Sequence, residues 1–374
     1  MNIKINYNSI YIYSILFLVS GMSIIEALDF LYEISFNNVY NTIFAIIFFL
    51  FIIGLFSNKL KLLMSNYIKL FIIFFIVVSL SYFLNYSSEF SNRKYFLFFG
   101  GGLLLTLFSS AIKPDMYKYL PHSIVFFALV NAIIILGYSL KLDGITELRW
   151  TMITQVETDL IYITRSLGLS IITVFFYLKN KLFKILILLV LFYLMLILNE
   201  VGPLLAVIIS FFFYYSRKNS FYIFLSMLGG VIMYFFVIQQ FIHDLTLDEI
   251  LNDPRVEIYT KSFNYFLNRP FFGIGIGGTA YFLNSYQSAH NIFLEIASEF
   301  GVVALIPFIG MVILLIKKYL VNKEYPLSYL WLYSFIVVQF SGDIGLNTIY
   351  WFISAIFISV PIIKSHPKST QFRN

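Results

Sequence analysis

The sequence predicts an all-α integral membrane protein with about 12 transmembrane helices in one bundle. Hydrophobic residues make up 60% of its 374 positions and charged residues only 12%, with a mean hydropathy of +0.86. Soluble domains do not have this composition. Apolar runs of about 20 residues, the length that crosses a hydrocarbon core of about 30 Å, recur along the chain. Basic residues also concentrate in alternate connections, as they do in multi-pass proteins.

The candidate spans are twelve apolar runs at residues 9–28, 39–56, 67–85, 95–112, 121–140, 160–178, 182–198, 201–215, 221–241, 300–316, 326–341 and 344–363. Most connections between them are short, so residues 1–374 are expected to form a single polytopic membrane domain. The main exception is residues 242–299, a large loop between spans nine and ten. Long ordered loops usually act as lids or binding surfaces, so the active site is expected there.

The positions of Lys and Arg predict that both termini are cytoplasmic and that the loop 242–299 is periplasmic. In this orientation 17 of the 25 basic residues lie on the cytoplasmic side, where such residues are retained during insertion. Lys4 before an apolar run is also typical of a signal peptide, but Glu26 and Asp29 end that run without a small-residue cleavage site. A retained first span is therefore expected. The net charge of +6 requires no nucleic acid partner, and the absence of cysteine excludes thiolate chemistry.

The stretch "DPRVEIYTKSFNYFLNRP" within the loop predicts an amphipathic helix. Asp253 is a suitable N-cap, Pro254 suits the first helical position, and Pro270 ends the helix. Helical spacing places several apolar side chains on one face: Val256, Tyr259, Phe263 and Phe266. This face is expected to lie against the bundle or the membrane interface.

Two interpretations fit the glycine-rich stretch "GIGIGGT" that follows. It is not a dinucleotide fingerprint, which needs a βαβ unit, nor a Walker loop, which needs a lysine. Glycines such as Gly275 and Gly277 allow a tight, close-packed turn between two helices. Alternatively, their backbone N–H groups bind a substrate anion.

A second helix is predicted to begin in "SAHNIFLEIASEFG", with Ser288 as its N-cap and His290 in its first turn. Asn291, Glu295 and Ser298 form a polar stripe on this helix. A helix amino terminus favours a neutral imidazole and attracts anions. A single histidine is often only a structural hydrogen-bonding residue. Among the four histidines, however, His290 alone lies beside both a polar stripe and a glycine turn, which makes it the candidate base.

These segments, "NRPFFGIGIGG" followed by "HNIFLEIASEFGVVALI", resemble the signature of the O-antigen polymerase and ligase family. The family pattern is His, then Asn, Ser or Gln, nine residues, Gly, two residues, and Gly, Thr or Tyr. It maps onto His290, Asn291 and Gly301, with Ala304 at the last position. Ala304 departs from the pattern, which argues against the ligase variant more than against the family.

The resemblance implies an integral membrane glycosyltransferase of the bacterial inner membrane. Such an enzyme polymerises undecaprenyl-diphosphate-linked oligosaccharide repeat units into O-antigen or a related surface polysaccharide on the periplasmic face. It uses no cofactor, nucleotide sugar or essential metal. The partners implied are the lipid-linked glycans as donor and acceptor, membrane lipids and a chain-length regulator, with no nucleic acid. A ligase that transfers the glycan to a lipid acceptor is the alternative. A transporter is disfavoured, because no internal repeat or mid-membrane ionisable group is visible.

The family chemistry implies roles for individual residues. His290 acts as general base on the acceptor hydroxyl, and arginines stabilise the departing diphosphate. Arg255 occupies the place of a family arginine, while Arg165 is an ionisable residue within apolar sequence. For both, snorkelling to headgroups or a structural ion pair is the alternative. The predicted substrate-binding residues are Asn291, Glu295, Gly275, Gly277 and Arg149.

Overall fold

The structure is a computed structural model that describes residues 7–21, 23–25, 28, 39–85, 88–139, 160–198, 200–216, 254–282, 289–340 and 343–360. These residues form helices and connections without any β-strand. The elements in chain order are α1 (Tyr7–Leu16), η1 (Phe17–Gly21), α3 (Val39–Phe56), α4 (Asn66–Leu84), α5 (Glu89–Leu97), η2 (Phe98–Leu104), α6 (Leu105–Ser110), η3 (Pro114–Tyr119), α7 (Leu120–Ser139), α9 (Leu160–Tyr177), α10 (Lys181–Leu198), α11 (Val201–Ser216), α14 (Pro254–Asn268), α15 (Gly278–Phe282), α16 (Ile292–Val321), α17 (Pro326–Val337) and α18 (Thr348–Ser359).

The all-helical class is confirmed for the described residues, but twelve full spans are not. Four helices are long and apolar enough to cross a membrane: Asn66–Leu84, Tyr119–Gly137, Lys181–Leu198 and Ile292–Val321. Other apolar helices are shorter, and the predicted span 221–241 lies outside the described residues. The first predicted run turns π-helical at Phe17–Gly21. The last two helices have 12 residues each, about 18 Å at 1.5 Å per residue, so apolar length in sequence did not translate into helix length.

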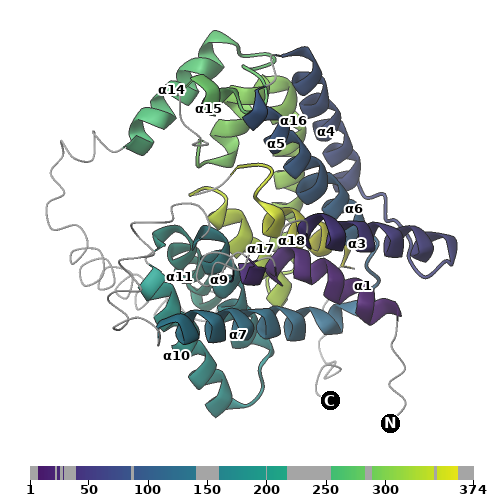
Figure 1. Ribbon diagram of the computed structural model, residues 1–374, viewed down its shortest axis with the longest axis vertical. Coiled ribbons are helices and arrows are strands. Elements are labelled where there is room, and N and C mark those ends of the chain that lie inside the picture. The colour runs from purple at the N-terminus through teal and green to yellow at the C-terminus, as the bar shows by residue number, and fades with distance from the viewer. Residues whose placement is uncertain are drawn as a thin grey trace, which may run out of the picture.

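The two short helices α17 and α18 lie in the middle of the bundle, as Figure 1 shows. Helices α11 and α9 pack on α17, and α6 and α16 pack on α18. Trp351 of α18 is fully buried and contacts Phe71 of α4 edge-on, with 5.1 Å between ring centroids. Because α17 and α18 are enclosed by protein, their polar ends are held at defined positions inside the bundle.

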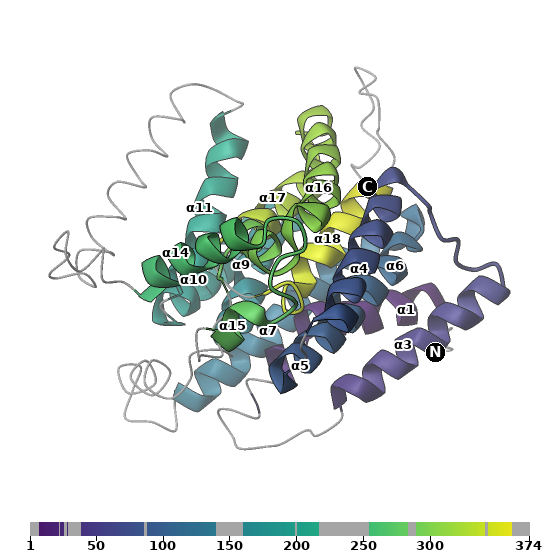
Figure 2. The same ribbon diagram turned by 90° about the horizontal axis from the view of Figure 1, so that it is seen from above.

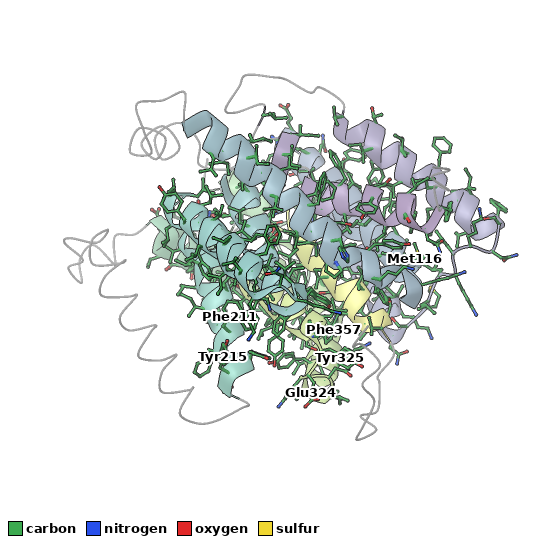
Figure 3. All side chains as sticks on the ribbon, turned by 90° about the horizontal axis from the view of Figure 1, so that it is seen from below. Met116, Phe211, Tyr215, Glu324, Tyr325 and Phe357 are labelled. Carbon is green, nitrogen blue, oxygen red and sulfur yellow. The ribbon has the colours of Figure 1, made fainter. Side chains whose placement is uncertain are left out.

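The longer helices run so that corresponding ends gather on one side of the molecule. In Figure 2 the outer ends of α11 and α16 lie on the upper side, and α5 and α15 lie toward the lower side. In Figure 3, seen from below, Tyr215 at the end of α11 lies on the same side of the molecule as Glu324 and Tyr325 of the α16–α17 connection. This arrangement is the one that the predicted topology requires, because both segments are predicted to be cytoplasmic. The orientation in the membrane stays a prediction.

The outer surface of the long helices is apolar, as expected of helices that face lipid. Exposed residues include Phe83 on α4 (73%), Leu182 on α10 (70%) and Ile306 on α16 (65%). Soluble proteins rarely expose contiguous apolar surface of this kind. The described helices therefore form a membrane bundle with a polar site at one end, described next.

Candidate functional site

The amino-terminal end of α16 forms one wall of the site. Asn291 is the N-cap, and its side-chain Oδ1 accepts hydrogen bonds from Phe293 N (3.1 Å) and Leu294 N (3.1 Å). The prediction of an N-cap at Ser288 is therefore wrong, because Asn291 provides the oxygen that the first helical N–H groups need. His290 precedes the helix and does not lie in its first turn.

His290 adopts an unusual backbone conformation just before this cap. Its φ is 50°, in the left-handed region. Among the described residues, Asn58 is the one other non-glycine residue with positive φ. Such conformations cost free energy and occur often at functional sites. His290 therefore lies in a turn directly before α16, in a backbone conformation that a helix start does not normally require.

The glycine turn is joined to α16 by backbone hydrogen bonds at a break in that helix. Gly301 has φ 68° and is non-helical, so nearby backbone groups lack their usual partners within the helix. The N–H groups of Ile274 and Gly275 donate to the carbonyls of Ser298 (3.0 Å) and Glu299 (2.9 Å). In return, Val302 N and Val303 N donate to the carbonyls of Pro270 (2.8 Å) and Phe271 (3.3 Å).

This close backbone approach explains why glycine is needed on both sides. Gly273 has φ 65°, and a Cβ there would lie 2.3 Å from the Glu299 backbone carbon. A Cβ at Gly301 would lie 2.3 Å from the Phe271 carbonyl oxygen. The close-packed turn, one of the two interpretations of the glycine stretch, is what the structure contains.

A buried ion cluster lies directly beneath the turn. Lys94 of α5 lies 2.6 Å from Glu295 Oε1 and donates to Glu299 at 2.9 Å and 2.8 Å. All three side chains are at most 1% exposed. Burial opposes the charge on Lys94, but the neighbouring carboxylates outweigh it, so the pKa of Lys94 is raised above its ordinary value. Gly277 N donates to Glu299 Oε2 (2.9 Å), which ties the turn to the same cluster.

The connection between α17 and α18 extends this cluster toward the centre of the bundle. Ile344 N donates to Glu295 Oε1 (3.1 Å), and the Ile344 carbonyl accepts from Trp351 Nε1 (2.8 Å). The preceding Asp343 accepts from Gly345 N (2.8 Å) and Leu346 N (2.9 Å) through Oδ1. This segment, "DIGLN" at 343–347, carries no motif that predicts a role in the site.

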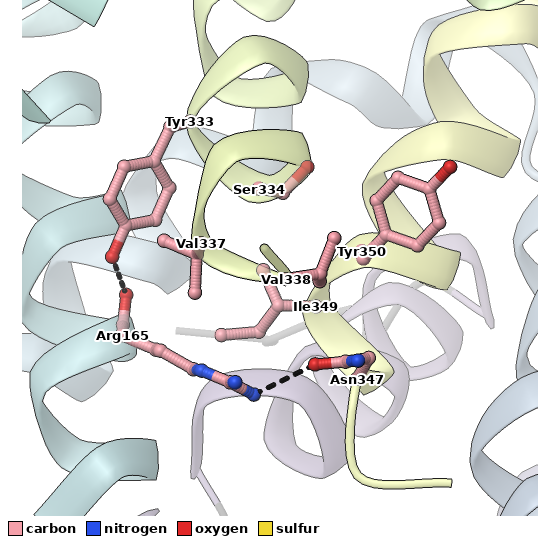
Figure 4. A pocket seen from close by; sticks show the side chains of 8 residues that line it. All are labelled: Arg165, Tyr333, Ser334, Val337, Val338, Asn347, Ile349 and Tyr350. Carbon is pink, nitrogen blue, oxygen red and sulfur yellow. Dashed lines mark hydrogen bonds between the residues drawn. The ribbon is translucent and has the colours of Figure 1, made fainter. Parts of the chain in front are cut away.

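Arg165 of α9 reaches the other end of this connection. Its Nη1 donates to Asn347 Oδ1 (3.0 Å), and its carbonyl accepts from Tyr333 OH (2.9 Å). Gly168, one helical turn on, lets the Tyr333 ring approach, since a Cβ there would lie 2.3 Å from Tyr333 OH. Figure 4 shows the guanidinium pointing toward Asn347 at the edge of a small pocket. Its lining residues are Arg165, Tyr333, Ser334, Val337, Val338, Asn347, Ile349 and Tyr350.

The pocket and the start of α16 meet at the carboxyl-terminal end of α17. Val338 lines the pocket, and its carbonyl accepts from Ile292 N (3.2 Å). The next residue, Gln339, accepts from Asn291 Nδ2 (3.3 Å) through Oε1. The turn that contains His290 and the pocket lined by Arg165 therefore both contact the carboxyl-terminal end of α17, although the two residues are far apart in sequence.

Comparison with known families identifies part of this region. Residues 201–309 match the family described as O-antigen ligase. Over these residues the chain is similar to that family. The match confirms the family resemblance and includes α11, α14, the glycine turn, His290 and the start of α16. No curated protein matches the chain.

Several predicted residues lie in or next to this O-antigen ligase family segment. Of the predicted site, the structure brings Asn291, Glu295, Gly275, Gly277 and Arg165 to one end of the bundle together with His290. Arg149 lies outside the described residues. The backbone of Arg255 lies in the first turn of α14, and its side chain lies outside the described part. Their roles, like those of the other site residues, stay predictions.

Sequence reasoning missed four polar residues that organise the site beside the family segment. These are Lys94, Glu299, Asp343 and Asn347, all at most 4% exposed. Lys94 gave little signal in the sequence, because it immediately precedes the apolar run 95–112, and lysines at the ends of spans commonly reach the membrane interface. The described residues contain no group of three or more His, Cys, Asp or Glu placed to hold a metal ion.

Proposed function

We propose that the protein polymerises undecaprenyl-diphosphate-linked oligosaccharide repeat units into O-antigen or a related surface polysaccharide on the periplasmic face of the inner membrane. The observation that carries the proposal is the match to the O-antigen ligase family over 201–309, the segment that contains His290. The convergence of this segment with Arg165 at one end of α17 supports it.

The proposed reaction is a single displacement at the anomeric carbon of the donor glycan. His290 accepts the proton of an acceptor hydroxyl while that oxygen bonds to the anomeric carbon. The bond from the anomeric carbon to the diphosphate breaks, and undecaprenyl diphosphate leaves with the bonding electron pair. Arg165 and Arg255 stabilise the charge that develops on the leaving group, because the guanidinium is permanently cationic and suits phosphate oxygens.

The position of His290 gives a physical reason why this residue can act as the base. It lies directly before the N-cap, where the partial positive charge of a helix terminus favours the neutral form of imidazole. A neutral imidazole can accept a proton, whereas an imidazolium cannot. Its left-handed backbone conformation holds it outside the regular helix, and its side chain is half-buried.

The experiment compares wild-type protein with His290→Ala and His290→Gln in a purified assay with lipid-diphosphate glycan. Loss of a general base is expected to lower turnover by about 10²–10⁴. His122→Ala is the matched control, because His122 is an exposed histidine on α7 that hydrogen-bonds Lys118 O. If His290→Ala retained near wild-type turnover, the general-base role would be wrong. The turn would then have only a structural role or a role in binding an anion.

The ligase alternative is favoured by the description of the matched family, O-antigen ligase. Supplying lipid A–core acceptor together with the lipid-diphosphate glycan separates the two activities. A polymerase yields a ladder of longer lipid-linked chains from repeat units alone. A ligase yields no ladder and transfers the glycan to the added acceptor.

A further inference from the structure

Helix α14 has three kinds of face, although a helix at a protein surface needs only two. Ile258 (5% exposed) and Ser262 (0%) form its buried line. At about 100° per residue, Phe263 and Leu267 lie on one flank of that line and are 51% and 58% exposed. Phe263 lies on the predicted apolar face, about two helical turns from half-buried Val256, so this face borders the buried line and is partly exposed.

The opposite flank of α14 is polar. Glu257 and Lys261 form an exposed ion pair one helical turn apart, and Thr260 and Asn264 are exposed next to them. One side of the helix thus suits water, one suits protein, and one suits an apolar medium. A helix with these three neighbours belongs at the boundary between protein, water and lipid.

The apolar flank continues beyond the helix. Phe271 and Phe272 are 65% and 67% exposed, the largest exposures among the apolar residues of this region. The backbone that carries them is held in place, because the Phe271 carbonyl accepts from Val303 N and lies close to Gly301. Two highly exposed aromatic side chains on one turn indicate apolar surroundings at this surface.

The same turn is continuous with the lipid-facing side of a membrane span. Gly301 begins the apolar part of α16, and its outward residues Ile306, Ile309 and Ile313 are 65%, 40% and 45% exposed. Figure 2 shows α14 lying across the direction of α11 and α16. A helix that crosses the spans at one end of them lies parallel to the membrane surface.

We propose that α14 and the Phe271–Phe272 turn form an interfacial anchor that inserts its apolar flank into the outer edge of the bilayer. The occupant of this surface is lipid, and the anchor extends from Phe263 and Leu267 to the two phenylalanines. Amphipathic helices of this kind bury their apolar face about 5–10 Å into the headgroup and acyl boundary. The anchor would hold the glycine turn, and with it the start of α16, at the level of the membrane surface.

The absence of cysteine from the chain makes the test direct. Leu267→Cys and Phe272→Cys each carry one nitroxide label, with Asn264→Cys and Lys261→Cys as matched controls on the polar flank of the same helix. The full-length variants are reconstituted in vesicles of phosphatidylethanolamine and phosphatidylglycerol. Electron paramagnetic resonance then measures label accessibility to oxygen, which partitions into lipid, and to a water-soluble nickel chelate.

The proposal predicts that the ratio of oxygen to nickel accessibility is several-fold higher at 267 and 272 than at 264 and 261. Equal ratios at all four positions would overturn it, because the apolar flank would then face water. Labels at 267 and 272 that are shielded from both probes would also overturn it, by showing that a protein surface covers the flank. Since all four side chains point away from the buried line, two independent positions on each flank guard against misfolding of any one variant.

Discussion

The buried Lys94 cluster and the Arg165 pocket contain similar charges at the same end of the bundle, yet they are built differently. Lys94 contacts two carboxylates, and those carboxylates also accept backbone N–H groups from Gly277 and Ile344. Arg165 meets the neutral amide of Asn347 and borders a small pocket. The first cation is therefore enclosed within the fold by two buried carboxylates, whereas the second hydrogen-bonds an amide and borders a small pocket, with Glu200 and Asp343 adding negative charge around it.

Lys94→Met should have the largest effect on stability. It leaves Glu295 and Glu299 buried without their counter-ion, and breaking such a pair costs about 3–5 kcal/mol. The unfolding temperature in detergent should fall sharply, and adding Glu295→Gln and Glu299→Gln should recover most of the loss. Lys261→Met is the control, since its partner Glu257 is exposed, and it should leave the unfolding temperature unchanged. A small effect of Lys94→Met would remove the distinction between the two regions.

Arg165→Ala should mainly reduce activity. Removing one donor that stabilises a developing anion lowers turnover by about 10²–10³. We expect a smaller fall in unfolding temperature than for Lys94→Met, because Arg165 borders a pocket, whereas Lys94 is enclosed by two fully buried carboxylates. Arg165→Lys should restore little transfer, since an ammonium cannot make the bidentate contact.

Arg269→Ala, at an exposed position that follows α14, is the matched control and should retain most transfer. Turnover is measured with lipid-diphosphate glycan at saturating donor. If Arg165→Ala instead loses as much stability as Lys94→Met and keeps the turnover of its folded fraction, Arg165 is a structural cation too.

Asp343→Asn should have the smallest effect and should act on both regions at once. The amide oxygen can still accept from Gly345 N and Leu346 N, so the turn is kept, with a loss of about 0.5–1.5 kcal/mol. The negative charge near both Lys94 and Arg165 is lost. The unfolding temperature reports the first change, and the turnover of the folded protein reports the second. An effect as large as that of Lys94→Met would show that Asp343, and not the Glu295–Glu299 pair, is the main counter-charge of Lys94.

Sequence alone determined the class of the protein and the location of its family segment. Composition and apolar runs indicate a membrane protein, because hydrocarbon accepts only apolar side chains around hydrogen-bonded helices. The signature around His290 and Gly301 predicted a resemblance to the family, and the match over 201–309 confirmed that resemblance. The start of α14 at Pro254 was also predicted correctly, since proline at a first helical position depends only on local backbone geometry.

Only the tertiary structure decided how the polar residues are used. Glu295 lies on a predicted polar stripe, but whether it meets substrate or Lys94 depends on α5, some 200 positions earlier in the chain. The role of the glycine turn became clear only from the break in α16 at Gly301. The backbones of the turn and of α16 approach so closely there that a side chain at a glycine of either segment would collide with the other segment. Likewise, apolar spacing identified α14 as amphipathic but not which of its flanks faces protein. Local spacing determines periodicity, whereas partners that are distant in sequence determine what each face contacts.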